Sequence, residues 1–130
     1  MVEHVGEADT QVRVLIVDDA DAVRKLIRSL LQKASDIQVV GEAGDGAEAI
    51  NLARELRPDV VLMDVTMPVM DGIEATAAIT EELPEVRVLG LSISAESEVA
   101  EAMVAAGAAD YITKGGHADD LLEAIRGRPR

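Results

Sequence analysis

The sequence contains no cysteine, no tryptophan and no phenylalanine, and its one aromatic residue is Tyr111. Without cysteine, the chain excludes disulfide frameworks, thiolate zinc sites, iron-sulfur clusters and a thiol nucleophile. With a single aromatic ring, it lacks the stacking platforms on which proteins bind single-stranded nucleic acids. The two histidines, His4 and His117, lie too far apart in the sequence to indicate a ligand pair. These absences exclude several classes of catalytic and metal-binding site.

Basic residues are scarce: the sequence has 12 Lys and Arg residues against 25 Asp and Glu residues, and its net charge is -13. The excess of negative charge opposes binding to DNA, RNA or an anionic membrane, and it favours binding of cations or basic partners. No run of about 18 apolar residues occurs, and the N-terminal segment lacks the basic and apolar regions of a secretion signal. We therefore expect a cytoplasmic protein that binds neither nucleic acid nor membrane directly.

The length of 130 residues fits one folded domain. Residues 1–11 are acidic with few apolar positions, and they predict a disordered N-terminal arm. We expect the folded domain to cover residues 12–127, with residues 128–130 as a C-terminal tail or the start of a linker to a missing output domain.

Short runs rich in Val, Ile and Leu alternate with amphipathic segments along the chain. The runs predict five strands: Val12–Val17, Ile37–Val40, Val60–Met63, Val86–Leu91 and Ala109–Ile112. Apolar residues at helical spacing follow the first strand: Val23, Leu26, Ile27, Leu30, Leu31 and Ala34. Further helices are expected at Ala47–Leu56, Ile73–Leu83, Glu96–Ala106 and, after the last strand, Ala118–Ile125, with Gly107 ending the fourth. Apolar strands that alternate with helices predict an α/β fold, in which helices cover both faces of a parallel sheet.

Polar side chains stand where the predicted strands end. Asp18 and Asp19 follow the first strand, Asp64 the third, Ser92 the fourth and Lys114 the fifth. In an open parallel sheet, ligands bind beyond the carboxyl ends of the strands, where the strand order reverses. These five residues are therefore the candidate site.

Three carboxylates would converge if the first and third strands were neighbours. At ~5 Å and an effective dielectric near 20, each pair of carboxylates repels by about 3 kcal/mol, so a cation is needed. Mg²⁺ suits oxygen ligands and leaves room for phosphate oxygens. With Lys114 opposite and the Ser92 hydroxyl as a donor, one carboxylate becomes a candidate nucleophile toward phosphorus.

Each of these residues also has a simpler interpretation. Asp18 and Asp19 fit an N-cap and a first-turn acid of the first helix, and Asp64 before Met-Pro fits a turn. Lys114 could be a solvated surface lysine, and Ser92 a hydroxyl satisfied by the backbone. Their joint occurrence at the ends of four strands favours one shared site.

A second motif would indicate a dinucleotide site. Gly44, Gly46 and Ala49 fit the pattern G-x-G-x-x-A after a strand. Asp45 disfavours this interpretation, because it places negative charge where the pyrophosphate would lie.

Four segments together resemble the response regulator receiver domain, the phosphoacceptor of bacterial two-component signalling. They are VLIVDD, VVLMDVTMPVMDG, VLGLS and AADYITK, and the resemblance covers Val12 to Ile125. The segments VVGEAGDGAEAI, RPDVVLMDVTMPVMDGIEAT and DLLEAIRG are similar to the NarL/FixJ (LuxR-type) subfamily, whose members usually carry a helix-turn-helix output domain after the receiver. The resemblance implies a flavodoxin-like, doubly wound (βα)5 fold of strand order 2-1-3-4-5, with the site at the ends of strands one and three.

The resemblance also assigns the residues of the site. It implies that Asp64 is the phosphorylated carboxylate and that Asp19 and Asp64 bind Mg²⁺ directly, Mn²⁺ being an alternative ion. The backbone carbonyl of Thr66 would be the third protein ligand, and Asp18 would act through water.

Further residues are assigned in the same way. Ser92 and Lys114 would contact the phosphoryl group, and Ser92 and Tyr111 would form the switch, with Tyr111 as the rotating aromatic. The chain departs from the family where Gly115 follows the lysine, because a Pro in a cis peptide often stands there. Thr66 and Ser94 offer no carboxylate or amide to orient a water, which indicates slow self-dephosphorylation.

The expected function is that of a signalling switch and not of a metabolic enzyme. A sensor histidine kinase would phosphorylate Asp64 in a Mg²⁺-dependent reaction. The face built from the fourth helix, fifth strand and fifth helix would then change, with homodimer formation and control of transcription through a DNA-binding output domain absent here. The alternatives are a Mg²⁺-dependent phosphatase or phosphotransferase acting on small molecules, and a docking module that works without phosphorylation.

Overall fold

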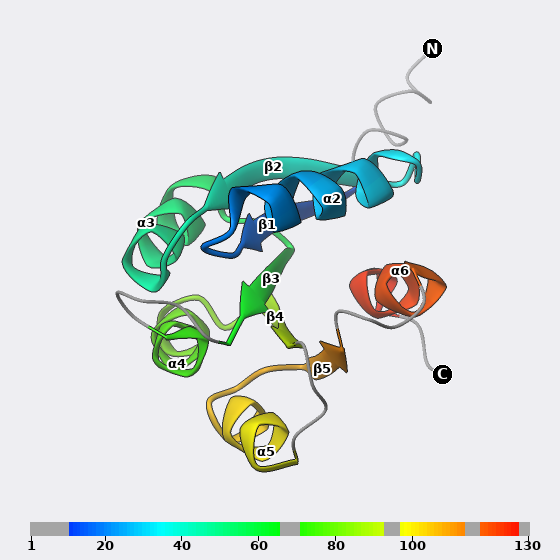
Figure 1. Ribbon diagram of the computed structural model, residues 1–130. Coiled ribbons are helices and arrows are strands. Elements are labelled where there is room, and N and C mark those ends of the chain that lie inside the picture. The colour runs from blue at the N-terminus through cyan, green and yellow to red at the C-terminus, as the bar shows by residue number, and fades with distance from the viewer. Residues whose placement is uncertain (1–10, 66–70, 93–96, 114–117, 128–130) are drawn as a thin grey trace.

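The fold is a five-stranded parallel sheet of order β2-β1-β3-β4-β5 flanked by helices (Figure 1). The computed structural model describes residues 11–65, 71–92, 97–113 and 118–127. The strands are β1 (Val12–Val17), β2 (Ile37–Ala43), β3 (Val60–Asp64), β4 (Arg87–Ser92) and β5 (Asp110–Thr113). The helices are α2 (Asp21–Gln32), α3 (Gly46–Leu56), α4 (Gly72–Glu82), α5 (Ser97–Ala105) and α6 (Ala118–Arg126). The predicted flavodoxin-like α/β fold and its strand order are confirmed.

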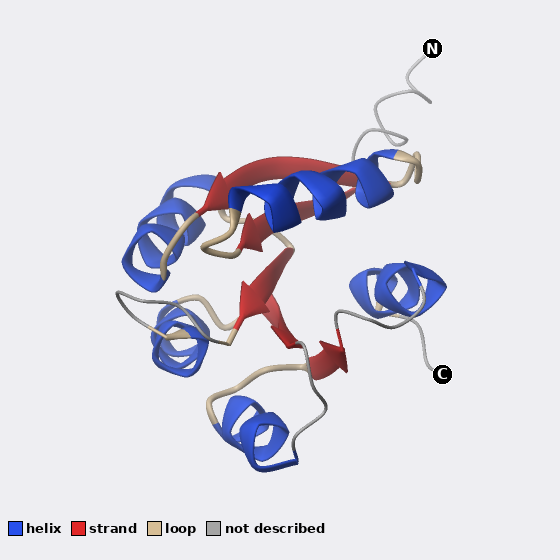
Figure 2. Cartoon of the chain, in the orientation of Figure 1, coloured by secondary structure: helices blue, strands red, loops and turns tan. Residues whose placement is uncertain are grey.

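The helices form two layers with the sheet between them (Figure 2). Alternate residues of each strand point to opposite faces of a sheet. On one face, strand residues such as Leu15 and Met63 pack with α3, α4 and α5. On the other face, residues such as Ile16 and Leu62 pack with α2 and α6. Burial on both faces explains why β3 is apolar at every position before Asp64.

Strand β2 is longer than the predicted Ile37–Val40. It continues to Ala43, because Glu42 and Ala43 pair with Ile16 and Val17 of β1. Gly41 and the charged Glu42 interrupt the apolar run, so the run alone ends the strand too early. The extension carries Glu42 to the carboxyl edge of the sheet, beside the end of β1.

One residue of the predicted apolar face of α2 lies outside the core. Ile27 and Leu31 are buried, whereas the side chain of Leu26 is 61% exposed. Residues four apart lie on one stripe of a helix, and the stripe through Ile27 and Leu31 is the one that faces the sheet. Leu26 is displaced from this stripe toward solvent, so the buried face of α2 is narrower than the apolar positions of the sequence indicate.

Gly107 ends helix α5 as predicted. Its φ of +111° is in the left-handed region, where a glycine carries no steric penalty. Its N–H donates to the Val104 carbonyl (2.9 Å), and the Ala108 N–H donates to the Met103 carbonyl (2.9 Å). This pair of bonds is a Schellman motif. The turn leads the chain from α5 into β5, the strand that carries Tyr111.

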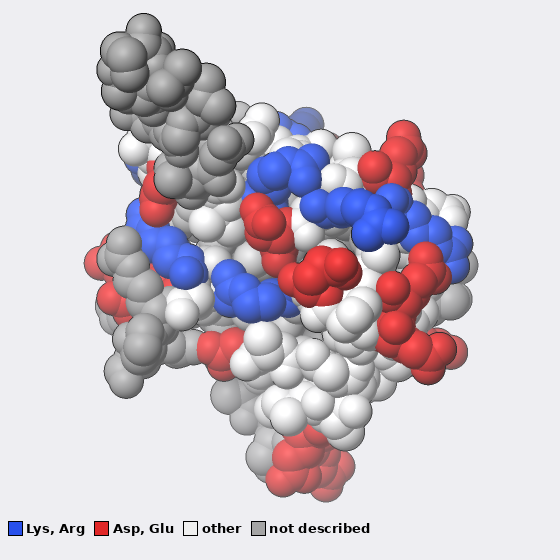
Figure 3. All heavy atoms as spheres, turned by 180° about the vertical axis from the view of Figure 1, so that it is seen from behind, with Lys and Arg blue, Asp and Glu red and all other residues white. Residues whose placement is uncertain are grey.

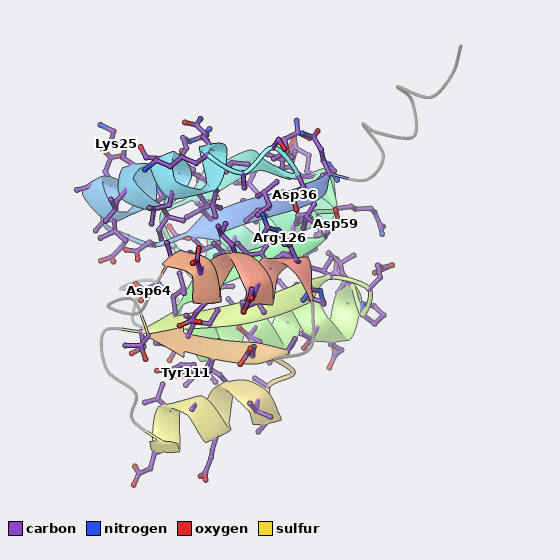
Figure 4. The ribbon with its side chains drawn as sticks, turned by 90° about the vertical axis from the view of Figure 1, so that its right-hand side faces the viewer. Lys25, Asp36, Asp59, Asp64, Tyr111 and Arg126 are labelled. Carbon is purple, nitrogen blue, oxygen red and sulfur yellow. The ribbon has the colours of Figure 1, made fainter. Side chains whose placement is uncertain are left out.

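Basic and acidic side chains are interspersed on the side opposite to the view of Figure 1 (Figure 3). Arg126 on α6 pairs with Asp36 at 2.7 Å, and Figure 4 places both at the end of the strands opposite to Asp64. Arg54 donates to Glu82 at 2.6 Å and holds the pKa of that carboxyl below its usual value. Within the described ranges, no helix combines the length and the apolar character needed to cross a bilayer.

Candidate functional site

The structure brings three aspartates together at the carboxyl edge of the sheet. Strands β1 and β3 pair in parallel, with Val17 opposite Met63, so Asp18 and Asp64 leave the sheet side by side. One carboxylate oxygen of Asp18, of Asp19 and of Asp64 lies within 4.8 Å of the other two. The predicted convergence therefore occurs, with Asp18 and Asp64 buried and Asp19 exposed.

Electrostatics make this cluster suited to a cation. At an effective dielectric near 20, two carboxylates about 5 Å apart repel by about 3 kcal/mol. Burial of Asp18 (1% exposed) and Asp64 (6% exposed) removes water that would otherwise weaken this repulsion. The hard oxygen donors match Mg²⁺, and the exposed carboxylate of Asp19 leaves the cluster open to solvent on one side. The residues present therefore fit a divalent cation.

Hydrogen bonds fix both the main chain and the side chain of Asp18. The Asp18 N–H donates to the Ala43 carbonyl of β2 at 3.1 Å. The Oδ1 atom of Asp18 accepts from the Ala20 N–H at 2.9 Å. Helix α2 begins at Asp21, and its N-cap Ala20 makes no side-chain cap bond. The interpretation of Asp18 and Asp19 as N-cap and first-turn acid is therefore wrong.

The first-turn acid of α2 is Asp21. The Lys25 ammonium donates to it at 3.1 Å, and Arg24 donates to it at 3.0 Å. The hydrogen bond and charge of Lys25, with a smaller effect of Arg24, lower the pKa of the Asp21 carboxyl. Asp21 is thereby paired with basic side chains of its own helix.

The start of helix α4 packs directly on the end of β3. A methyl group at Gly72 would lie 2.2 Å from the backbone oxygen of Asp64. The Gly72 N–H donates to the Val65 carbonyl (3.0 Å), and the Asp71 carboxylate caps the helix by accepting from the Glu74 N–H (2.8 Å). The close packing of Gly72 fixes the position of the Asp64 backbone. The sequence feature that indicates this packing is the glycine directly after the capping aspartate.

Ser92 and Tyr111 lie on the same face of the sheet. Ser92 ends β4 opposite Thr113, and Tyr111 lies opposite Gly90, two residues earlier. A methyl group at Gly90 would lie 2.9 Å from both Tyr111 Cδ1 and Met103 Cε of α5. The half-buried ring therefore fills the space over Gly90 between the sheet and α5 (Figure 4).

Arg24 and Glu42 lie beside the aspartate cluster, although the sequence pattern does not identify them as site residues. Arg24 Nη1 donates to the Asp18 carbonyl at 2.6 Å, and Arg24 Nε donates to Glu42 at 3.1 Å. The only local signal was the spacing of three between Asp21 and Arg24, which suits an ion pair on one helix face. The contact with Glu42 depends on the extension of β2 and leaves no local pattern.

The dinucleotide alternative does not fit the structure. The Asp45 carboxylate accepts from the Glu48 N–H at 2.8 Å, and Glu48 Oε1 accepts from the Gly44 N–H at 2.7 Å. Two carboxylates thus occupy the start of α3, where a pyrophosphate would need free N–H groups.

Some predicted residues lie outside the described part of the chain. They are Thr66, Ser94, Lys114, Gly115 and His117. The described candidates Asp18, Asp19, Asp64 and Ser92 lie at or next to the carboxyl ends of β1, β3 and β4, whereas Tyr111 lies within β5, two residues before its carboxyl end.

Comparisons with known proteins agree with this geometry. Residues 14–126 match the model of the response regulator receiver domain. The response regulator GacA of Pseudomonas viridiflava is 44% identical over 115 residues, which cover 88% of this chain and 54% of that protein. The response regulator VraR of Staphylococcus aureus is 45% identical, with 88% and 55% covered. The chain thus spans about half the length of these relatives.

Solved structures show the same likeness. A two-component response regulator of the LuxR family from Aurantimonas sp. SI85-9A1 superposes with a TM-score of 0.86 and 38% identity. The match covers 90% of this chain and 84% of that one. Both the fold and the NarL/LuxR-type likeness therefore extend over nearly all of the described residues.

Proposed function

The chain belongs to the response regulator receiver family, and on that premise we propose that it is a switch whose phosphoacceptor is Asp64. The observation that carries this proposal is the meeting of Asp64 with Asp18 and Asp19 within 4.8 Å at the edge between β1 and β3. Of the three aspartates, Asp64 is the one that ends the central strand β3, and the start of α4 packs against its backbone. The chain transfers one phosphoryl group to itself and is not a metabolic enzyme.

The three aspartates would hold the cation that the reaction needs. Asp19 and Asp64 are the proposed direct ligands, and Asp18 would act through water. The backbone carbonyl of Thr66, which follows β3 in the sequence, is proposed as the third protein ligand. Mg²⁺ held there, or Mn²⁺ in its place, supplies positive charge to the oxygens of the incoming phosphoryl group. The buried carboxylate of Asp18 would attract an ion in the cluster even without direct contact.

The chemical step is nucleophilic attack by the Asp64 carboxylate on phosphorus. An Asp64 oxygen forms the new O–P bond while the P–N bond of a phosphohistidine breaks and its electron pair returns to the imidazole. The Ser92 hydroxyl, at the end of the neighbouring strand β4, is proposed to donate to a phosphoryl oxygen. Lys114, which follows β5 in the sequence, is proposed to contact another.

The donor is proposed to be a sensor histidine kinase, and this chain is proposed to act in the cytoplasm. The responding face is formed by α5, β5 and α6, where Val104 of α5 is 58% exposed. We propose that phosphorylation promotes a homodimer and controls transcription. A DNA-binding output domain would carry that function, because GacA is about twice as long as the stretch it shares with this chain. The receiver is proposed to span residues 12–127, the three last residues leading toward that domain.

Acetyl phosphate as a small-molecule donor tests the proposed function. With Mg²⁺, intact mass should show one added phosphoryl group, and with a chelator it should show none. Thr66 and Ser94 carry no carboxylate or amide, so the adduct should decay slowly. Sustained turnover of a phosphate ester would instead identify a phosphatase, and partner binding that is unchanged by phosphorylation would identify a docking module.

Replacing Tyr111 with alanine should leave the phosphorylation reaction intact and weaken the conformational change that follows it. The ring lies over Gly90 on the same face as Ser92, so it can respond to a change at that hydroxyl. The alanine variant should still bind Mg²⁺ and accept one phosphoryl group, but amide shifts along α5 and α6 should move less on phosphorylation. Tyr111→Phe, which keeps the ring, is the matched control. Equal shifts in the alanine variant and the wild type would remove Tyr111 from the switch.

A further inference from the structure

Arg24 joins three elements at the edge of the sheet where the aspartates meet. From α2, its Nη1 donates to the Asp18 carbonyl at 2.6 Å, its Nε to Glu42 Oε1 of β2 at 3.1 Å, and its Nη2 to Asp21 Oδ1 at 3.0 Å. The side chain is only 17% exposed. A guanidinium has several donors in a fixed plane, so three simultaneous bonds restrict the position of each partner.

The carbonyl that Arg24 holds belongs to the peptide bond between Asp18 and Asp19. Orientation of this peptide sets the direction in which the Asp19 side chain leaves the backbone. The Asp18 N–H is bonded to the Ala43 carbonyl at 3.1 Å, and Ala43 follows Glu42 in β2. Two hydrogen bonds of Arg24 therefore connect the Asp18 carbonyl with Glu42. The chain from Glu42 to Ala43 and the bond from the Asp18 N–H to the Ala43 carbonyl connect Glu42 back to Asp18.

Resting on the proposed function, we infer that Arg24 is a positioning residue that orients the Asp18–Asp19 peptide for binding of the divalent cation. Its positive charge alone would act in the opposite direction, because a cation near the cluster repels a second cation. Orientation and charge thus predict opposite changes in Mg²⁺ affinity when the guanidinium is removed. This difference in sign makes the inference testable.

Arg28 provides a matched control on the same helix. Its Nε donates to Glu42 Oε2 at 2.6 Å, so it shares the acidic partner of Arg24, and no contact of Arg28 with Asp18 is seen among the described hydrogen bonds. The variants are Arg24→Met, Arg24→Lys and Arg28→Met. Lysine keeps the charge but lacks the planar set of donors, and it remains informative if the methionine variant does not fold.

Mg²⁺ affinity of the unphosphorylated protein should be measured by calorimetry or by amide shifts, well below each variant's melting temperature in chelator. Residues that orient metal ligands typically change affinity by about 10- to 100-fold. We expect Arg24→Met and Arg24→Lys to bind Mg²⁺ about tenfold more weakly than the wild type. Arg28→Met should retain the wild-type affinity within about twofold.

Three results would overturn the inference. Unchanged or tighter Mg²⁺ binding by Arg24→Met would show that orientation is not its role, and unchanged binding by Arg24→Lys would show that the planar set of donors is not required. An equal loss in Arg28→Met would assign the effect to the pairing with Glu42. Asp19→Asn distinguishes a failure of the proposed function itself, because wild-type affinity in that variant would remove Asp19 from the proposed ligands of the cation.

Discussion

Asp64→Asn is expected to abolish phosphorylation, so that intact mass after incubation with acetyl phosphate and Mg²⁺ shows no added phosphoryl group. The amide has the size of the carboxylate but lacks the anionic oxygen that attacks phosphorus. The change also removes one of three mutually repelling charges that lie within 4.8 Å. The variant should therefore melt at a higher temperature than the wild type in chelator, which shows that the missing label does not reflect unfolding.

The matched control for this variant is Asp59→Asn. Asp59 precedes β3 and lies at the opposite end of the strand from Asp64 (Figure 4). Its Oδ2 accepts from the Arg13 N–H at 2.8 Å, a bond that an asparagine oxygen can also accept. Asp59→Asn should take up one phosphoryl group as the wild type does. Stable labelling of Asp64→Asn, or a label found on His4 or His117, would contradict the assignment of Asp64.

Gly72→Ala is expected to lower the free energy of unfolding by roughly 1–3 kcal/mol, the usual cost of overpacking a filled site. The added methyl group would lie 2.2 Å from the Asp64 backbone oxygen and 2.8 Å from Val65 Cα. These atoms belong to a buried strand end, so they cannot rotate away as a flexible side chain could. Alanine gains at most about 1 kcal/mol over glycine in a helix, which is too little to offset the clash.

Thermal or urea unfolding in chelator measures this effect, with a decrease in melting temperature of about 4 °C per kcal/mol for a domain of this size. The displaced Asp64 should also accept phosphoryl groups more slowly. Gly44→Ala is the control, because a methyl group there would lie 3.7 Å or more from its neighbours. Its melting temperature should stay constant or rise slightly, and a wild-type melting temperature for Gly72→Ala would contradict the proposed packing of α4 on β3.

The amino-acid sequence by itself determined the helices, the strands apart from the carboxyl end of β2, and the residues of the acidic cluster. Apolar runs such as Val60 to Met63 are visible locally because burial on both faces requires every position to be apolar. Asp18 and Asp64 are visible for the complementary reason, since a charge directly after a buried run marks the end of a strand. Parallel strands share one carboxyl edge, so the two residues could be expected to meet.

Contacts between segments that are distant in the sequence were decided only by the tertiary structure. The bonds from Arg24 to Glu42 and to the Asp18 carbonyl require β2 to run past its apolar part and α2 to lie against it. The approach of Gly72 to the Asp64 backbone depends on the direction in which α4 leaves the sheet. The local pattern of apolar and polar residues indicates which side chains are buried, because burial restricts the residue type at each position. It does not indicate which polar atoms form a hydrogen bond with each other, because that depends on the relative placement of whole helices and strands.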